Sequence, residues 1–538
     1  MKFTDKYTNT AALITPVICS FLYISLIFND NLWMDEAFSA VLIKGSFSSV
    51  LENSAKDTLP PLYNILGWCA ARLFGFSAPT LRLVSILPMI GILILSATLV
   101  RRYFGNMASI LFSICITGMP QMLYYGTEIR MYALGLFFVT ACGILAVTDN
   151  SAGGFTAFIL CALGAGYTHH FAFVAVGFIF LFLLVKALIS GNKKNLLKIV
   201  IQIAVTAILY IPCLITTLHQ MKRVTGYFTM PDINAAFIIS CIKQPFITGI
   251  TPLSAILILI YPCVCALKLL SELCIPAADK KDHDVIFPVI SGPLLFLCVL
   301  LFGAAACIIL KTNIFSERYL FPTYGMLWLS FSIAASGLKN NALKKPTSTG
   351  KDLISGHRSM IAGILPLIPR LFPVIITPIL TAVLVTDYIT EFKASYDPSV
   401  EEMKTYFEQN ISPDDTYIIH EKNYEIEICF RYYFPEFKKT DWDKADPADG
   451  SQLWYIRPVN ESENSSPISG ETKDSGTYQI SDTGQISDTD QHSNSVIVPD
   501  ADPDPTAEIS GHGYTCEYAG DFSFDRYHFR LYKITGQL

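Results

Sequence analysis

The acidic side chains best suited to proton chemistry lie in the polar segment of residues 29–63. Asp35 and Glu36 are adjacent there, with Trp33 and Met34 before them and the apolar run AFSAVLI after them. An apolar surround raises the pKa of a carboxyl group toward the range useful for proton abstraction. The pattern therefore predicts a general base in this pair. The alternative is a pair of solvated loop carboxylates.

A further carboxylate, Asp57, stands three residues before the run Pro60–Pro61–Leu62–Tyr63. The two prolines suppress helix and favour an extended backbone, which would give the carboxylate a defined position. Two interpretations stay open. Asp57 could act in a site, or it could cap the helix that follows.

Three later motifs place charged and aromatic side chains at the ends of hydrophobic stretches. Ionisable groups at membrane depth are costly and usually face a cavity or a partner. An arginine there could bind a phosphate through two parallel hydrogen bonds, and a second cation would suit the same ligand. The alternatives are a structural Glu128–Arg130 pair and side chains that extend to the membrane surface. The motifs are YYGTEIRMY with Tyr125, Glu128, Arg130 and Tyr132, YTHHFAF with His169 and His170, and ERY with Glu317, Arg318 and Tyr319.

The two adjacent histidines do not form a metal site by themselves, because neighbouring residues on a helix face different ways. One imidazole could still join Asp35, Glu36 or Asp57 around a divalent cation. No cofactor is required by any other motif in the sequence.

The elements that position these residues are hydrophobic helices. Of the 538 residues, 52% are hydrophobic and only 16% are charged, which is typical of a polytopic helical membrane protein. Because a span needs about 20 apolar residues, we predict eleven spans, and a shorter interfacial helix at Leu62–Phe76. The spans are 11–28, 81–100, 107–123, 131–148, 155–168, 171–189, 199–217, 251–270, 285–310, 319–337 and 360–387.

Lys and Arg in the short loops predict the orientation, since they accumulate on the cytoplasmic side. With eleven crossings, these cations all fall on the side of the N-terminus. The first loop (29–80) and the C-terminal tail then both lie outside the cytoplasm. The cations are Lys2, Lys6, Arg101, Arg102, Lys186, Lys193, Lys194, Lys198, Lys280, Lys281, Lys339, Lys344, Lys345, Lys351 and Arg358.

The tail, residues 391–538, is predicted to be a small extracytoplasmic α/β domain that follows a membrane domain of residues 1–390. VEEMKTYFEQN is typical of an amphipathic helix and YIIH of a strand. From about 460 to 510 the composition shifts to Ser, Thr, Asp, Gly and Pro, and QISDT occurs twice, which predicts a disordered insert. A disulfide could join Cys429 and Cys516, the two cysteines of the tail.

The order of these motifs resembles the C-type (GT-C) membrane glycosyltransferases, which use polyprenyl-phosphate sugars. The likeness is to the bacterial relatives of protein O-mannosyltransferases and of the lipid A aminoarabinose transferase, and it covers about residues 15–335. It rests on the Asp–Glu pair in a long first loop, D-x-x-P-P-L-Y, LRLVS, YYGTEIRMYAL, YTHHFAF and ERYLFP. One departure is Leu59, where the family commonly has His directly before the two prolines.

The resemblance implies a transferase that moves a sugar from a polyprenyl phosphate to an acceptor on the outer face of the bacterial cytoplasmic membrane. The acceptor could be a lipid, a glycan or a protein. Asp35 would be the base with Glu36 beside it, Asp57 would support the acceptor or a metal, and Arg130 and Arg318 would hold the phosphate. The other residues implied to bind substrate are Tyr63, Tyr125, Glu128, Tyr132, His169 and Tyr319.

Two other classes of function compete with this one. A transporter or flippase of a lipid-linked saccharide would show an inverted repeat and charges at mid-membrane. The sequence shows no such repeat, and its charged motifs gather at one predicted membrane face. A sensor or scaffold would leave Asp35 replaceable. No basic patch with interleaved aromatic residues points to nucleic acid.

Overall fold

The structure is a computed structural model that describes residues 2–148, 152–224, 233–247, 251–273, 285–336, 368–420, 423–445, 451–459 and 505–537. The chain forms two compact units. One unit, here called the membrane unit, comprises Met1–Phe28 and Ser46–Phe392. The other, the C-terminal unit, comprises Asn29–Gly45 and Lys393–Leu538. Residues 29–45, which the sequence analysis groups with the membrane domain, therefore cluster with the tail.

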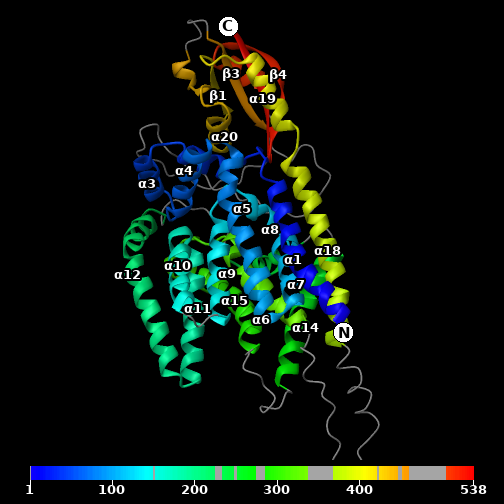
Figure 1. The fold of residues 1–538 in the computed structure, drawn as a ribbon. Helices are drawn as coiled ribbons and strands as arrows, with labels where there is room; N and C mark the ends of the chain where they lie inside the picture. The colour runs from blue at the N-terminus through cyan, green and yellow to red at the C-terminus, as the bar shows by residue number, and fades with distance from the viewer. Residues whose placement is uncertain are drawn as a thin grey trace, which may run out of the picture. The chain divides into compact units, whose positions relative to one another are not determined.

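Helices dominate the membrane unit (Figure 1), and each of the eleven predicted spans overlaps one. Residues 360–367 of the last predicted span lie outside the described residues. In the described part of the chain, seven helices are long and apolar enough to cross a membrane, as expected of a multi-pass membrane protein. Four others, α7, α9, α10 and α16, are shorter, so the count of eleven crossings stays a prediction. The helices are α1 (Lys2–Ser25), α5 (Ala78–Leu95), α7 (Asn106–Gly118), α9 (Tyr132–Thr148), α10 (Ala152–Thr168), α11 (His170–Ile189), α12 (Lys193–Val224), α14 (Thr251–Leu273), α15 (Ile286–Leu310), α16 (Tyr324–Ala335) and α18 (Ile368–Ser395).

Short helices connect these long ones. Ser46 caps α3 by accepting a hydrogen bond from the backbone of Ser49 (3.2 Å), and Ser77 caps α5 in the same way. Gly75, with a φ of +90°, ends α4, which occupies the stretch where a helix is predicted after the two prolines. These helices are α3 (Phe47–Lys56), α4 (Leu62–Phe74), α6 (Arg101–Phe104), α8 (Met122–Thr127) and α13 (Ala235–Lys243), together with the π-helix η1 (Ser96–Val100) and the 3₁₀ helices η2 (Gln244–Phe246) and η4 (Glu317–Thr323).

The core of the membrane unit surrounds α16. Every residue of this helix is buried, as expected for a helix that is apolar on all sides. Helix α15 packs closely against it at Gly292, where a Cβ atom would lie 2.2 Å from the carbonyl oxygen of Met326. Small residues of this kind let membrane helices approach each other.

The C-terminal unit contains a five-stranded sheet with the order β2-β1-β3-β5-β4, which confirms the small sheet domain. The parallel part pairs β1 (Thr416–Ile419) with β2 (Lys438–Lys439) and β3 (Leu453–Val459). The antiparallel part adds β5 (Tyr527–Gln537) and β4 (Tyr514–Phe524). A large core joins strand residues to α2 (Met34–Ile43), α19 (Ser399–Asn410) and α20 (Tyr424–Tyr433), and a second, smaller core includes α21 (Pro505–Gly511).

Two details of the C-terminal unit bear on the predictions. Helix α21 begins at Pro505, so residues 505–510 of the predicted insert are helical, because Ile509 is buried against the sheet. The rest of the predicted insert, 460–504, lies outside the described residues. Cys429 and Cys516 are not joined by a disulfide, because they belong to different cores.

Candidate functional site

In the membrane unit, three motifs that are far apart in sequence meet through their rings. The Tyr132 ring lies 5.1 Å from that of Tyr125 and 5.8 Å from the His169 ring, measured between centroids. The His169 ring in turn lies 5.1 Å from that of Tyr319. The structure therefore brings together four of the predicted substrate-binding residues, from α8, α9, the N-cap of α11 and η4. We call these four rings the aromatic cluster.

Charged groups converge on the same cluster. Arg130 and Arg318 both lie within electrostatic range of the Tyr132 hydroxyl and the His169 ring, and Glu128 lies within range of the same hydroxyl. Tyr132 is fully buried, and its hydroxyl has no hydrogen-bond partner among the described residues. Of the charged groups within range of the Tyr132 hydroxyl, two are guanidinium groups and one is a carboxylate, a balance that suits an anionic ligand such as a phosphate.

Arg130 lies in a short non-helical turn between α8 and α9, and helix α5 holds this turn. The buried Arg82 donates from Nη1 to the carbonyl oxygen of Thr127 (2.9 Å). Ser85 donates to the carbonyl oxygens of Glu128 (2.5 Å) and Arg130 (3.3 Å). Sequence reasoning missed Arg82 and Ser85 as site residues, although a charged residue inside the apolar LRLVS stretch was a usable signal.

The loop that carries Asp57 is anchored to the membrane unit through its backbone. His170 Nε2 donates to the carbonyl oxygen of Thr58 (3.1 Å), and Gln220 donates to that of Leu59 (3.1 Å). Asp57 is the C-cap of α3, and its carboxylate accepts a hydrogen bond from the backbone of Thr58 (2.7 Å). The N-cap of the following helix is Pro61. The prediction that Asp57 could cap that helix is therefore wrong.

The histidines of YTHHFAF are both engaged with backbone groups. His169 Nδ1 accepts a hydrogen bond from the backbone N–H of Phe171 (3.2 Å) and so caps α11. His170 Nε2 donates to the carbonyl oxygen of Thr58. Within the described residues, no three His, Cys, Asp or Glu side chains are arranged to hold a metal ion.

In the C-terminal unit, Asp35 and Glu36 form the first turn of α2 and are only 7% and 4% exposed. The alternative of solvated loop carboxylates is therefore wrong. Helix α2 packs against α20, so that Met34 and Ala37 join the same core as Cys429. Negative charge at the start of a helix is stabilised by the backbone N–H groups and the helix dipole.

Glu425 of the tail lies within electrostatic range of Asp35, and Arg526 lies near Glu425; sequence reasoning missed both tail residues. Burial raises the pKa of Glu425 on α20, and the charge of Asp35 adds to the rise. A hydrogen bond from Tyr527 and the charge of Arg526 lower the same pKa. The Arg526 guanidinium lies over the Trp33 ring, 4.6 Å from its centroid. The tail thus contributes charged groups to the surroundings of Asp35.

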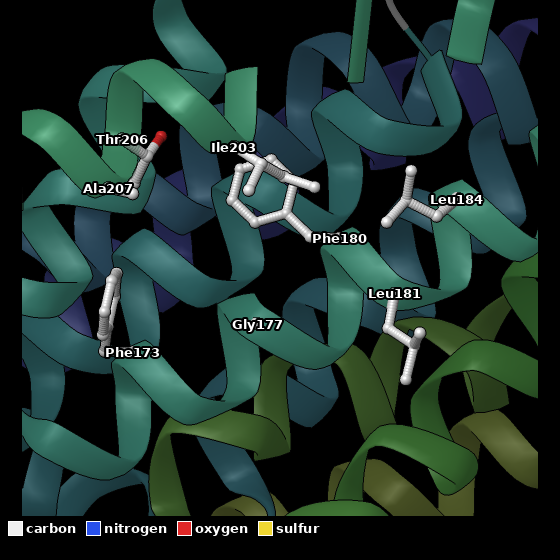
Figure 2. Close-up of a pocket in the computed structure, with 8 residues that line it drawn as sticks. All are labelled: Phe173, Gly177, Phe180, Leu181, Leu184, Ile203, Thr206 and Ala207. Atoms are coloured by element: carbon white, nitrogen blue, oxygen red, sulfur yellow. The ribbon is translucent and has the colours of Figure 1, made fainter. Parts of the chain in front are cut away.

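An apolar cavity of about 360 Å³ lies between α11 and α12 (Figure 2). Its single side-chain polar atom is the Thr206 hydroxyl, which is buried and has no hydrogen-bond partner among the described residues. Phe173 at one end of the lining is one helical turn from His169 of the aromatic cluster. The cavity suits an apolar chain and not a phosphate. It is lined by Phe173, Gly177, Phe180, Leu181, Leu184, Ile203, Thr206 and Ala207.

No protein-family model matches the chain, and no curated protein does either. Solved structures do resemble it. ArnT from Cupriavidus metallidurans bound to undecaprenyl phosphate matches with a TM-score of 0.57 and 11% identity, over 96% of this chain and 97% of that one. The apo state of the same protein matches with a TM-score of 0.52 and 13% identity, over 82% and 92%. The Archaeoglobus fulgidus oligosaccharyltransferase, in complex with Zn and sulfate, has a TM-score of 0.39 and 12% identity, over 82% and 68%.

The two ArnT matches cover most of both chains, and they show the fold. The chain therefore has the GT-C-like fold that its motifs predict, a polytopic helical unit with a small C-terminal sheet domain. This likeness assigns no role to individual residues of the chain, because fold alone does not define a site.

Proposed function

We propose that the protein is a glycosyltransferase that moves a sugar from a polyprenyl-phosphate donor to an acceptor on the outer face of a bacterial cytoplasmic membrane. The observation that carries this proposal is the convergence of Arg130 and Arg318 on a buried aromatic cluster in a GT-C-like membrane unit. That ArnT binds undecaprenyl phosphate supports the choice of donor.

The two arginines would act on the leaving group. Transfer breaks the bond between the anomeric carbon and the phosphate oxygen, and the electron pair stays on the phosphate. Guanidinium groups that are already in place stabilise this developing charge without reorganisation. In a buried setting such hydrogen bonds to a charged oxygen are stronger than neutral ones.

Asp35 would act on the acceptor. Its carboxylate takes the proton of the acceptor hydroxyl or amine as the new bond to the anomeric carbon forms. The burial of Asp35 supports this role, since a carboxylate in an apolar surround is a stronger base than one in water. Glu36 adds a second negative charge, and Asp57 would support the acceptor.

The aromatic cluster and Glu128 would contact the substrate. Tyr125, Tyr132, His169 and Tyr319 supply ring faces and polar edges around the two arginines, with Glu128 as an acceptor of hydrogen bonds. The apolar cavity between α11 and α12 would take part of the polyprenyl chain, because its lining is hydrocarbon apart from Thr206.

The test compares cell envelopes by mass spectrometry in a deletion strain that is complemented with wild type, with Asp35→Asn or with a control. Asp414→Asn is a suitable control because Asp414 is an exposed carboxylate of the same unit. We expect one sugar modification to be absent from the deletion strain and from Asp35→Asn, and to be restored by wild type and by Asp414→Asn.

Two results would contradict the proposal. A well-folded Asp35→Asn protein that restores the modification would remove Asp35 from catalysis. An unchanged envelope in all strains, with a lipid-linked precursor accumulating on one leaflet, would instead indicate a transporter.

A further inference from the structure

Three buried hydroxyl and guanidinium groups of the membrane unit lie outside the proposed chemistry, and they are connected to the turn that carries Arg130. Arg82 and Ser85 are three residues apart on α5, so both face the same side of the helix. They are 1% and 0% exposed, and both donate to backbone carbonyl groups of residues 127–130. Tyr63, the third group, contacts Ser85 across 3.1 Å.

The direction of these hydrogen bonds follows from the chemistry of the groups. A carbonyl oxygen only accepts, so the single proton of Ser85 points at the turn, closest to the oxygen of Glu128 (2.5 Å). The Ser85 oxygen can then only accept from Tyr63, whose hydroxyl must be the donor. The result is a chain from Tyr63 through Ser85 to the Glu128 carbonyl, in which each bond polarises the next.

The chain joins two parts of the predicted site. Tyr63 is the second residue of α4, which begins directly after the two prolines, so its position depends on the loop that contains Asp57. His170 and Gln220 hold that loop through the carbonyl groups of Thr58 and Leu59. The turn at the other end has a tight hydrogen bond from the Arg130 amide to the Glu128 carbonyl (2.7 Å) and no helical ladder. Its geometry therefore depends on donors from outside.

We propose that Ser85, together with Tyr63 and Arg82, is a positioning residue for Arg130. The hydrogen-bond chain holds the turn in the one conformation that directs the guanidinium group toward the donor phosphate. Tyr63 then serves through its hydroxyl to Ser85 and not through contact with the substrate, which differs from the role predicted for it. This inference rests on the proposed function, because it assumes a phosphate ligand at Arg130.

A buried serine in a membrane helix can also be there only for packing, and the chain offers a matched case. Ser96, one residue beyond the end of α5, is fully buried and donates to the carbonyl oxygen of Ser109 (3.0 Å) on α7. It also contacts Ser113 (2.8 Å), and neither Ser109 nor Ser113 lies in a turn that carries a predicted site residue. Ser96→Ala therefore removes a comparable buried hydrogen bond without touching the Arg130 turn.

The experiment measures binding of two probes, undecaprenyl phosphate and undecaprenol, to the full-length protein in lipid nanodiscs. The variants are Ser85→Ala, Tyr63→Phe, their double variant and Ser96→Ala. We expect Ser85→Ala to weaken binding of undecaprenyl phosphate about tenfold and Tyr63→Phe about threefold, in the range expected for a lost hydrogen bond. The double variant should be no weaker than Ser85→Ala, and undecaprenol binding should be unchanged throughout. Ser96→Ala should bind both probes as wild type does.

Several outcomes would overturn the inference. One is wild-type affinity for undecaprenyl phosphate in Ser85→Ala, and another is equal weakening for undecaprenol, which would mark a general loss of structure. Additive effects of Ser85→Ala and Tyr63→Phe on binding would mean that the two hydroxyl groups act independently and do not form one hydrogen-bond chain. If Ser85→Ala does not fold, Tyr63→Phe alone decides, because it removes one oxygen atom and must still discriminate between the probes. A wild-type protein that binds both probes equally would overturn the proposed donor itself, a result separate from any effect of Ser85.

Discussion

The Arg130 turn of the membrane unit and the Asp35–Glu36 pair of the C-terminal unit are built in opposite ways. Arg130 lies on an irregular backbone, and a helix from elsewhere in the chain supplies the donors that hold it. Asp35 and Glu36 lie on the first turn of a regular helix, which stabilises their charge with its own N–H groups. The cationic region thus depends on long-range hydrogen bonds, whereas the acidic region depends on local structure and on the packing of α2 against α20.

The largest expected effect separates the two regions by function. Asp35→Asn should lower kcat by about 10²–10⁴-fold, the usual value of a general base, and leave binding of undecaprenyl phosphate unchanged. The measurement is turnover of the sugar donor identified from the envelope comparison, together with the affinity for undecaprenyl phosphate. An equal loss of affinity in Asp35→Asn would mean that the acidic region also serves donor binding.

The complementary change in the cationic region is Arg130→Lys. Lysine keeps the charge but cannot make two parallel hydrogen bonds to a phosphate. We expect binding of undecaprenyl phosphate to weaken about tenfold, which corresponds to about 1.4 kcal/mol. The control is Arg72→Lys, because Arg72 is exposed on α4. Full affinity in Arg130→Lys would contradict the bidentate contact.

The apolar cavity between α11 and α12 can be tested by filling it. Gly177 lines the cavity, and a Cβ atom there would meet nothing within 4 Å. The Gly177→Leu protein should therefore fold, and its leucine side chain should occupy the cavity. Binding of undecaprenyl phosphate should weaken about fivefold, or about 1 kcal/mol. Binding of a short isoprenyl phosphate should be unaffected, and Gly177→Ala is the matched control. Equal loss for long and short chains would show that the cavity does not hold the chain.

The smallest expected effect is on stability in the C-terminal unit. The pKa of Glu425 is raised above its ordinary value of 4.5, mainly by burial. The folded state therefore binds the proton more tightly than the unfolded state, and stability falls as pH rises above that ordinary value. Glu425→Gln should raise the melting temperature at pH 7 and reduce its fall between pH 4.5 and 7.

The groups that face Glu425 in its own unit include Asp35, Arg526 and Tyr527, so the measurement needs a control outside this group. Glu408→Gln is suitable because Glu408 is exposed on α19. The prediction fails if Glu425→Gln and Glu408→Gln shift the melting temperature equally at both ends of the pH range.

Much of the fold could be predicted from local sequence, because helix and strand periodicity and the length of apolar runs act over a few residues. The helix predicted around VEEMKTYFEQN is α19, and the strand predicted at YIIH is β1 with a shift of one residue. The end of the predicted insert is helical and not disordered, because a contact distant in sequence decides its structure. Its composition is polar, but Ile509 finds an apolar surface that only the folded sheet provides.

The candidate site was predictable in its residue types and less so in its connections. The sequence predicts Tyr125, Tyr132, His169 and Tyr319 as substrate-binding residues, and the structure brings their rings together. Ser85 and Glu425 were missed, because a serine in an apolar helix and a glutamate in a soluble helix are ordinary in sequence. Their roles become visible only from their partners in space, which are the Glu128 carbonyl group for Ser85 and Asp35 for Glu425.

The many apolar helices, the small α/β tail and the charged motifs at helix ends can be predicted from the sequence, because each of these follows from a short-range pattern. Only the folded chain shows that residues 29–45 cluster with the tail, that Tyr63 contacts Ser85, and that Ser85 donates to the turn that carries Arg130. The physical reason is that a buried hydroxyl or carboxylate must find its partner in space, and partners separated by 22 to 43 residues along the chain leave no local pattern.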